Sequence, residues 1–324
     1  MREIAKSDIE AAADIVYRTF GPTPAYAWPL LARRVGCEVW VKHENHTPIG
    51  AFKVRGGLVY MDELARSGRP VAGVISATRG NHGQSIALAA AKAGVPAVIY
   101  VPEGNSVEKN AAMEAFGAEL VVHGRDFDAA REACEQAAEE RGLHMVPSFH
   151  MALVRGVATY AMEFFQAAPD LDVAYVPIGM GSGICGMIAA RDALGLSTDI
   201  VGVVSSGAPT VALSFEAGRP VPTNEARTFA DGMACRIPNE AALGIVREGA
   251  ARIVTVTDDE FAEAMRCFYE DTHNLAEGAG AAALAALMRE RDRLAGKKAG
   301  VVLSGGNIDR GVYLDVLNGA TPAS

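Results

Sequence analysis

Short apolar runs rich in β-forming residues alternate with helical segments along most of the chain, and this alternation limits the possible folds more than any other feature. The runs are residues 73–76, 97–101, 119–122, 173–176, 200–204 and 299–303. They are almost continuously apolar, as expected of strands covered on both faces, and strands separated by helices usually pair in parallel. The sequence therefore predicts an α/β fold.

Several helix boundaries can be read from local signals. Residues 6–18 have helical spacing, with Ser7 as the expected N-cap. Residues 84–93 and 127–140 are each followed by a glycine that favours a helix end, and residues 257–260 form a capping box. We expect a helix at each of these positions.

Composition excludes several classes of protein. Half of the 324 residues are hydrophobic, which suffices for a large core or for two domains. Lys and Arg number 30 against 39 Asp and Glu, so no basic surface for nucleic acid is expected. The five cysteines are widely separated and form no C-x-x-C pair, which disfavours a disulfide framework or a zinc knuckle. A reducing, cytoplasmic environment is expected.

Membrane association is not expected either. No apolar run approaches the about 18 residues of a membrane span, and residues 1–6 lack the apolar core of a signal segment.

Lys53 is the first candidate for chemistry. It follows the strand-like run 38–41 and a turn punctuated by Pro48 and Gly50, and it enters a predicted helix. The positive end of a helix dipole, together with burial, favours the neutral amine, which is the nucleophilic and basic form. A solvated lysine at a helix end is the ordinary alternative.

A second candidate is the turn at residues 76–84, which follows a predicted strand and precedes a predicted helix. Its Gly80, Asn81, His82 and Gly83 offer amide donors at a helix start, where anions such as a substrate carboxylate bind. The alternative is that Asn81 and His82 cap the helix, and for His82 we favour capping over catalysis.

A third candidate is the glycine-rich turn Gly179-Met180-Gly181-Ser182-Gly183, whose amides can cradle a phosphate at a helix start. Residues 181–186 also match G-x-G-x-x-G, which indicates dinucleotide binding when an acidic residue follows about 20 positions later. The following strand ends with residues 203–206, Val-Val-Ser-Ser, without an acid. A nucleotide- or ligand-binding module is therefore the less favoured interpretation.

Ser304 directly follows the last apolar run and precedes Gly305-Gly306-Asn307. In order and spacing, the Lys53 turn, residues 76–84, residues 179–183 and residues 304–307 resemble the signatures of fold-type II pyridoxal-phosphate enzymes. This family has the tryptophan synthase β fold and includes the serine and threonine dehydratases and serine racemase. The resemblance extends from about Thr23 to Asp309.

The resemblance implies two open, mostly parallel twisted sheets flanked by helices. A small domain, residues 71–147, would be inserted into a large one formed by residues 1–70 and 148–324. Pyridoxal 5'-phosphate would lie in the cleft between them, and relatives suggest a homodimer.

The resemblance also assigns roles to residues around the cofactor. Lys53 would hold it as a Schiff base, and the freed amine would remove the substrate α-proton. Phe52 would pack on the ring, Asn81 would donate to the phenolic oxygen, and the glycine turn would hold the phosphate. Ser304 would make one hydrogen bond at the pyridine nitrogen. Because a hydroxyl cannot hold that nitrogen protonated as a carboxylate does, elimination is favoured over transamination.

The chain departs from the family at Thr78 and Arg79, where two hydroxyl residues are usual. In the racemases the second hydroxyl returns the proton, and a guanidinium is poorly suited to that task but well suited to a carboxylate. A racemase is therefore less expected, and an acidic or otherwise unusual substrate side chain more so, unless Arg79 faces solvent. The expected substrate contacts are Thr78, Arg79, Gly80, Asn81 and His82.

Softer matches to the family are the segment 229–232, with Asp231, and Glu277. Several relatives bind a divalent cation just after the strand at residues 200–204, but here residues 205–210 carry no carboxylate. No metal site is predicted there.

Together these features predict a cytoplasmic dehydratase that converts a β-hydroxy-α-amino acid to a 2-oxo acid and ammonia. Threonine, serine, phenylserine and hydroxyaspartate are all candidate substrates. A racemase or a threonine-synthase-like enzyme is the alternative within the family. The chain ends 15 residues after Asp309, which leaves no room for the regulatory domain of biosynthetic threonine deaminases, so a catabolic role is expected.

Overall fold

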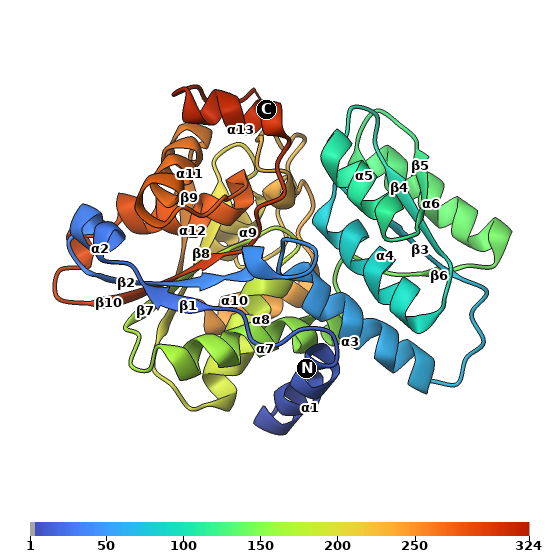
Figure 1. The fold of residues 1–324 in the computed structure, drawn as a ribbon, viewed down its shortest axis with the longest axis horizontal. Coiled ribbons are helices and arrows are strands. Elements are labelled where there is room, and N and C mark those ends of the chain that lie inside the picture. Colours follow the sequence, from blue (N-terminus) through green and yellow to red (C-terminus); the bar gives the residue numbers. More distant parts are fainter. Residues whose placement is uncertain (1–3, 324) are drawn as a thin grey trace.

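A computed structural model describes residues 4–323 of the chain and contains two sheets with helices packed around each of them (Figure 1). Both sheets are mostly parallel, so the predicted α/β class is confirmed. The two sheets lie side by side, and they differ in how much of the chain builds them.

The smaller sheet is built from one continuous stretch of chain. Its strand order is β5-β4-β3-β6, and all neighbours are parallel. The strands are β3 (Val74–Ala77), β4 (Ala97–Val101), β5 (Glu119–Val122) and β6 (His144–Met145). They are connected by α4 (Asn81–Ala93), α5 (Val107–Ala115) and α6 (Phe127–Arg141).

The larger sheet gathers strands from both ends of the chain in the order β1-β2-β10-β7-β8-β9. Its strands are β1 (Ala25–Ala27), β2 (Glu38–His43), β7 (Val173–Pro177), β8 (Asp199–Ser205), β9 (Arg252–Val256) and β10 (Lys298–Leu303). Only β1 pairs antiparallel among these described strands. Val301 of β10 lies opposite Val41 on one side and Tyr175 on the other, so the last strand in sequence is central.

Helices cover both faces of the larger sheet. The remaining helices are α1 (Lys6–Tyr17), α2 (Pro29–Val35), α3 (Lys53–Arg66), α7 (Met151–Ala167), α8 (Ser182–Ala193), α9 (Thr210–Ala217), α10 (Glu240–Gly249), α11 (Asp258–Thr272), α12 (Gly278–Arg289) and α13 (Arg310–Leu317), with short 3-10 helices η1 (Glu44–His46), η2 (Asp231–Met233) and η3 (Arg291–Arg293). One core lies between the sheet and α11 and α12, and a second lies between the sheet and α7 and α8.

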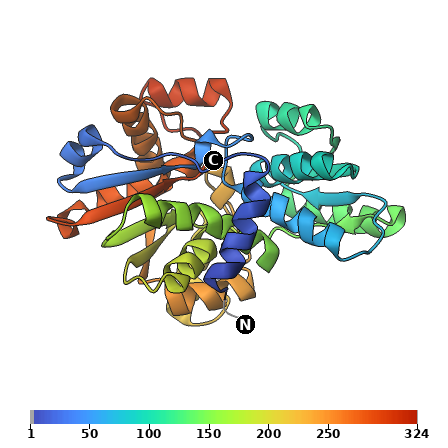
Figure 2. The same ribbon diagram turned by 60° about the horizontal axis from the view of Figure 1, so that its bottom comes forward.

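Helix α3 connects the two halves of the molecule because it packs against both α4 and α7, and α1 lies against α3 and α7 at this junction (Figure 2). Its Val54, Leu58 and Met61 share a core with Ile99 of the smaller sheet. A Cβ at Gly156 of α7 would lie 2.3 Å from the Arg55 carbonyl oxygen, so a glycine is needed for this close approach. Lys53, the first residue of α3, is therefore placed between the two sheets.

The sequence predictions of elements mostly agree with the structure. All six apolar runs form strands, α6 begins at Phe127 as predicted, and the Thr257–Glu260 capping box is present. The prediction of Ser7 as N-cap is wrong, because α1 begins at Lys6 and the Asp8 carboxylate accepts the amide of Ala5 at 3.0 Å.

The limits of the small domain, between residues 70 and 71 and between residues 147 and 148, stay a prediction. Within residues 4–323 no helix combines the length and apolarity needed to span a bilayer. Residues 1–3, on which the predicted lack of a signal segment partly rests, lie outside the described residues.

Candidate active site

The turn that delivers Lys53 is fixed by hydrogen bonds to its own residues and to the end of β10. The Thr47 hydroxyl accepts the Ala51 amide at 2.9 Å and donates to the Ala51 carbonyl at 2.8 Å. The Phe52 amide donates to the Ser304 carbonyl at 3.0 Å, and the Gly306 amide donates to the Gly50 carbonyl at 2.9 Å. Residues far apart in sequence, 47–53 and 304–306, thus form one wall of the site.

The Lys53 amine lies on a cavity of about 110 Å³, which is lined by all four sequence segments predicted to carry chemistry. Its Nζ donates to Ser182 Oγ at 3.3 Å and lies 4.9 Å from the centre of the Phe52 ring. Burial lowers the pKa of Lys53 to about 8, against the opposing influence of Glu277. About a fifth of this amine is therefore neutral near pH 7.4, against roughly a thousandth for an ordinary lysine, and the neutral form is the one that a nucleophile or base requires.

The glycine turn lies across the cavity at the N-terminus of α8. A Cβ at Gly179 would lie 2.0 Å from the Gly232 carbonyl oxygen, and Gly181 has a φ of +100°. The amides of Gly181, Ser182 and Gly183 find no acceptor within residues 4–323. Free amides at the start of a 12-residue helix form a site for a phosphate.

Ser304 is buried at the end of β10, where its hydroxyl donates to the Ala279 carbonyl at 3.3 Å. The residues present therefore fit pyridoxal phosphate. Lys53 would hold its aldehyde carbon, the α8 amides its phosphate, and the Ser304 hydroxyl its pyridine nitrogen.

The turn before α4 is held in shape by hydrogen bonds between its own residues. The Thr78 hydroxyl accepts the amides of Gly80 at 2.9 Å and Gly83 at 3.2 Å, so this side chain shapes the turn. Gly80 is the N-cap, and neither Asn81 nor His82 caps the helix. The amides of Asn81 and His82 have no acceptor among the described residues, which leaves them free for an anion.

Both the nitrogen and the oxygen of the Asn81 side-chain amide are hydrogen-bonded. It donates to Glu277 Oε1 at 2.6 Å and accepts a hydrogen bond from Asn307 Nδ2 at 2.8 Å. Glu277, a softer match in the sequence, thus lies on the cavity wall and fixes the orientation of Asn81.

His82 lines the same cavity without a polar partner at Nε2 among residues 4–323. Burial, together with the nearby charge of Lys53, lowers the pKa of His82 to about 3. Its imidazole is therefore neutral over the physiological range of pH.

Arg79 is not directed only to solvent, because its guanidinium pairs with Asp231 of η2 at 3.0 Å. Lys109 contacts the same carboxylate at 3.2 Å and Glu277 at 3.2 Å. Burial works to lower the pKa of Lys109, but the two carboxylates outweigh it and raise the pKa. An arginine that already has a carboxylate partner is less free to bind one from a substrate, contrary to our expectation from the sequence.

Lys109 was missed in the sequence. The only local signal is its position on α5, where it shares the buried face of the helix with Met113. A lysine at an apolar position of a helix indicates a buried partner, here Asp231 and Glu277.

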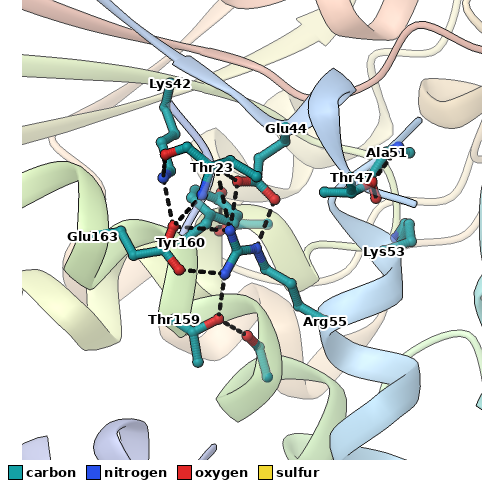
Figure 3. Close-up of polar contacts among 12 residues, drawn as sticks. Thr23, Lys42, Glu44, Thr47, Ala51, Lys53, Arg55, Thr159, Tyr160 and Glu163 are labelled. Carbon is teal, nitrogen blue, oxygen red and sulfur yellow. Dashed lines mark hydrogen bonds and ion pairs between the residues drawn. The ribbon is translucent and has the colours of Figure 1, made fainter. Parts of the chain in front are cut away.

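A buried ionic network lies beneath the Lys53 turn (Figure 3). Arg55 is fully buried and donates to Glu44 at 2.7 Å and to Glu163 at 2.6 Å. Glu163 also accepts from Lys42 at 2.5 Å, so two cations and two carboxylates neutralise one another. The network joins α3, β2, η1 and α7 directly behind Lys53.

Helix α7 also contacts two of the residues that line the cavity. Its Tyr160 packs edge-on against Phe52, with ring centres 5.9 Å apart, and donates to the Gly183 carbonyl at 3.2 Å. Tyr160 therefore links the Lys53 turn to the glycine turn.

No cluster of three or more His, Cys, Asp or Glu side chains suited to a metal is present in the part of the chain that the structure describes.

Comparisons with known proteins show the family to which the chain belongs. The sequence model described as "Pyridoxal-phosphate dependent enzyme" matches residues 16–305. The chain is 38% identical to L-threonine ammonia-lyase of Geobacter sulfurreducens over 86% of this chain and 69% of that one. It is 31% identical to L-threo-3-hydroxyaspartate ammonia-lyase of Saccharomyces cerevisiae, over 96% of both chains. Among solved structures, a pyridoxal 5'-phosphate-dependent aspartate racemase superposes with a TM-score of 0.90 at 29% identity, over 95% of this chain and 97% of that one.

Fold and site together define an enzyme that uses pyridoxal phosphate. Within that class, the chain belongs to the fold-type II pyridoxal-phosphate-dependent enzymes, as the resemblance implied.

Proposed function

We propose that the protein is a dehydratase that converts a β-hydroxy-α-amino acid to a 2-oxo acid and ammonia. The observation that carries this proposal is the buried Lys53 amine, which faces the free amides of α8 across one cavity and has a lowered pKa. Two relatives named L-threonine ammonia-lyase and L-threo-3-hydroxyaspartate ammonia-lyase support the same class of reaction.

The cofactor and the residues around it have separate roles in the proposed reaction. Bound pyridoxal phosphate supplies the electron sink for the pair released when the Cα–H bond breaks. Lys53 Nζ would hold the cofactor, and the same amine would take the α-proton of the substrate. The free amides of Asn81 and His82 hold the substrate carboxylate at the N-terminus of α4.

Loss of the α-proton and of the β-hydroxyl removes one water and leaves an enamine. Addition of one water to this enamine gives the 2-oxo acid and ammonia, so the atoms balance. The Ser304 hydroxyl carries no charge and would give the pyridine nitrogen only a neutral hydrogen bond, in place of the one that it donates to the Ala279 carbonyl, which favours this elimination over transamination.

The proposal is tested by incubating purified holoenzyme with threonine, serine, phenylserine and hydroxyaspartate, and measuring 2-oxo acid and ammonia. We expect equal amounts of the two products and no turnover by Lys53→Ala. Lys92→Ala, which changes an exposed lysine on α4, should keep full activity. Equal activity of the Lys53→Ala variant would contradict the proposed role.

A racemase is the second candidate, because a solved structure with the same fold is titled an aspartate racemase. Arg79, a poor proton donor, speaks against it. Chiral analysis of recovered substrate separates the two reactions, since only a racemase returns the opposite enantiomer.

Domain organisation, assembly and location complete the proposal. The smaller sheet lies within residues 74–145, which supports a domain at residues 71–147 between the two parts of a larger one. The five free cysteines support a reducing, cytoplasmic location, and the family resemblance supports a homodimer.

A further inference from the structure

A second cavity adjoins the one that contains Lys53. Its volume is about 620 Å³, and it shares Ala77, Met180 and Cys235 with the first cavity. It extends between the start of α6 and the loop that precedes α10. A substrate bound at Lys53 can therefore extend its side chain into this space, which is far larger than the methyl group of threonine requires.

The charged residues of the second cavity are already paired with one another or with a neighbour. Its arginines and their carboxylate partners are Arg79 with Asp231, Arg131 with Asp128 and Glu135, Arg227 with Glu225, and Arg236 with Asp128. Among the described lining residues no guanidinium is left without a carboxylate. The cavity thus offers no guanidinium without a carboxylate partner for a second carboxylate on the substrate, and only Nε of Arg79 is a buried donor without a hydrogen-bond partner among these described arginines.

Apart from the ion pairs and the polar side chains of Ser148, Asn224 and Asn239, the wall of the second cavity is apolar and partly aromatic. Phe127, Met145 and Phe149 line the side formed by the smaller sheet, and Met180 and Ile237 line the opposite side. Ile237 is 57% exposed and so contributes uncovered apolar surface to this cavity.

We propose that this second cavity binds the substrate side chain and that the preferred substrate carries a bulky apolar group, such as an aryl ring, on its hydroxyl-bearing carbon. This inference rests on the proposed function and specifies its substrate class. An aryl group covers the apolar wall, whereas a methyl group leaves it wet and a carboxylate meets only paired arginines.

The first experiment compares kcat/KM of the holoenzyme for threo-phenylserine, threonine, serine and threo-3-hydroxyaspartate. We expect phenylserine to exceed threonine by about tenfold or more, as added apolar groups do in matching pockets. A preference for threonine or hydroxyaspartate over phenylserine would overturn the substrate class and leave the dehydratase proposal intact. Absence of 2-oxo acid from every substrate would contradict the dehydratase proposal itself.

The second experiment uses Ile237→Asp, which places a carboxylate on the apolar wall. We expect kcat/KM for phenylserine to fall about tenfold and that for threonine to stay unchanged. The matched control is Leu314→Asp on α13, because Leu314 is 55% exposed and lies outside both cavities. An equal loss for both substrates, or no loss for either, would overturn the proposal.

Binding gives a readout independent of turnover. L-Phenylalanine carries the aryl group but has no β-hydroxyl to expel, and L-alanine lacks both groups. By calorimetry with the holoenzyme we expect phenylalanine to bind about tenfold or more tightly than alanine, and Ile237→Asp to remove most of this difference. Equal binding of the two amino acids to the unmodified enzyme would speak against the aryl pocket.

Discussion

The ionisation of Lys53 is set by its surroundings, and this makes cofactor uptake depend on pH. Only the neutral amine attacks an aldehyde, and burial lowers the pKa of Lys53 from 10.5 to about 8. We therefore expect the rate at which cofactor-free protein takes up pyridoxal phosphate to rise with pH and to level off above about pH 8. Stopped-flow absorbance would measure this rate, and a midpoint near 10.5 would contradict the buried environment.

The same shift affects the stability of the cofactor-free chain. Because the folded pKa lies below the unfolded one, the unfolded state binds more protons between pH 8 and 10.5. The free energy of unfolding should therefore rise with pH in this window through Lys53. Lys53→Met should flatten this part of the profile in urea titrations.

Among the substitutions discussed, we expect Arg55→Met to cause the largest loss of unfolding free energy. Arg55→Met leaves Glu44 and Glu163 buried without their main cation, and breaking a buried pair in this way costs about 3–5 kcal/mol of unfolding free energy. Urea denaturation measures the loss. The matched control is Arg66→Met on the same helix, where the ion pair with Asp62 is exposed and the change should stay below about 1 kcal/mol.

Residues whose role is local could be predicted from the sequence, and those whose role depends on distant partners could not. Lys53 and the glycine turn each lie next to a strand-to-helix turn that shows their chemistry. Arg55 meets Glu163 across 108 residues, and Lys109 meets Asp231 across 122. The sequence predicts Arg79 as a substrate contact, and it cannot show the pairing with Asp231, which likewise exists only in the folded chain.

Helix α8 depends on a glycine conformation at its first turn. Gly181→Ala forces an L-residue to a φ of +100° and places its Cβ 2.7 Å from that of Ala242. We expect the phosphate site to distort and pyridoxal-phosphate affinity to fall by about tenfold or more, since such strain costs about 1–3 kcal/mol. Fluorescence titration of the cofactor-free protein measures this affinity.

Gly244→Ala supplies the control for that experiment. Gly244 lies inside α10, and no atom lies within 4 Å of an added Cβ. An alanine there should stabilise the protein by about 0.5–1 kcal/mol and leave cofactor affinity unchanged. Equal losses of affinity in both variants would show that the effect is not specific to the turn.

Elements were predictable where burial gave them a clear apolar pattern. Five of the six predicted strands lie inside the two sheets, and the sixth, β5, is an edge strand that still carries the apolar run Leu120 to Val122. The strands that the sequence did not show are β1 and β6, of three and two residues, and β9 at the edge of the larger sheet. Strand β9 carries Arg252 and Thr255, whose polarity masks the apolar signal.

Across the whole molecule, charged groups join the smaller sheet region to the larger one around the site. Lys109 contacts Asp231 and Glu277, and Ser106 donates to Asp309 at 2.5 Å. These contacts hold the Asn81 turn against the Lys53 turn, which places the two anion sites around one cavity.

Lys109→Met tests the link between the two regions. It removes a nearly buried cation from between two carboxylates, so we expect a loss of about 3 kcal/mol in unfolding free energy. Hydrogen exchange should increase first at the amides of α5 and of the turn before α4. Lys92→Met, an exposed change on α4, should leave the exchange pattern as it is. A uniform increase across both sheets would argue against a contact specific to the junction.

The central place of β10 determines when the protein can fold during translation. Residues 74–145 supply every described strand of the smaller sheet, so this part can fold on the nascent chain soon after it leaves the ribosome. The larger sheet cannot join β2 to β7 until residues 298–303 have been made. Lys53 is translated early, but Ser304 follows β10 near the end of the chain, so the cavity between them is completed only in one of the final steps of synthesis.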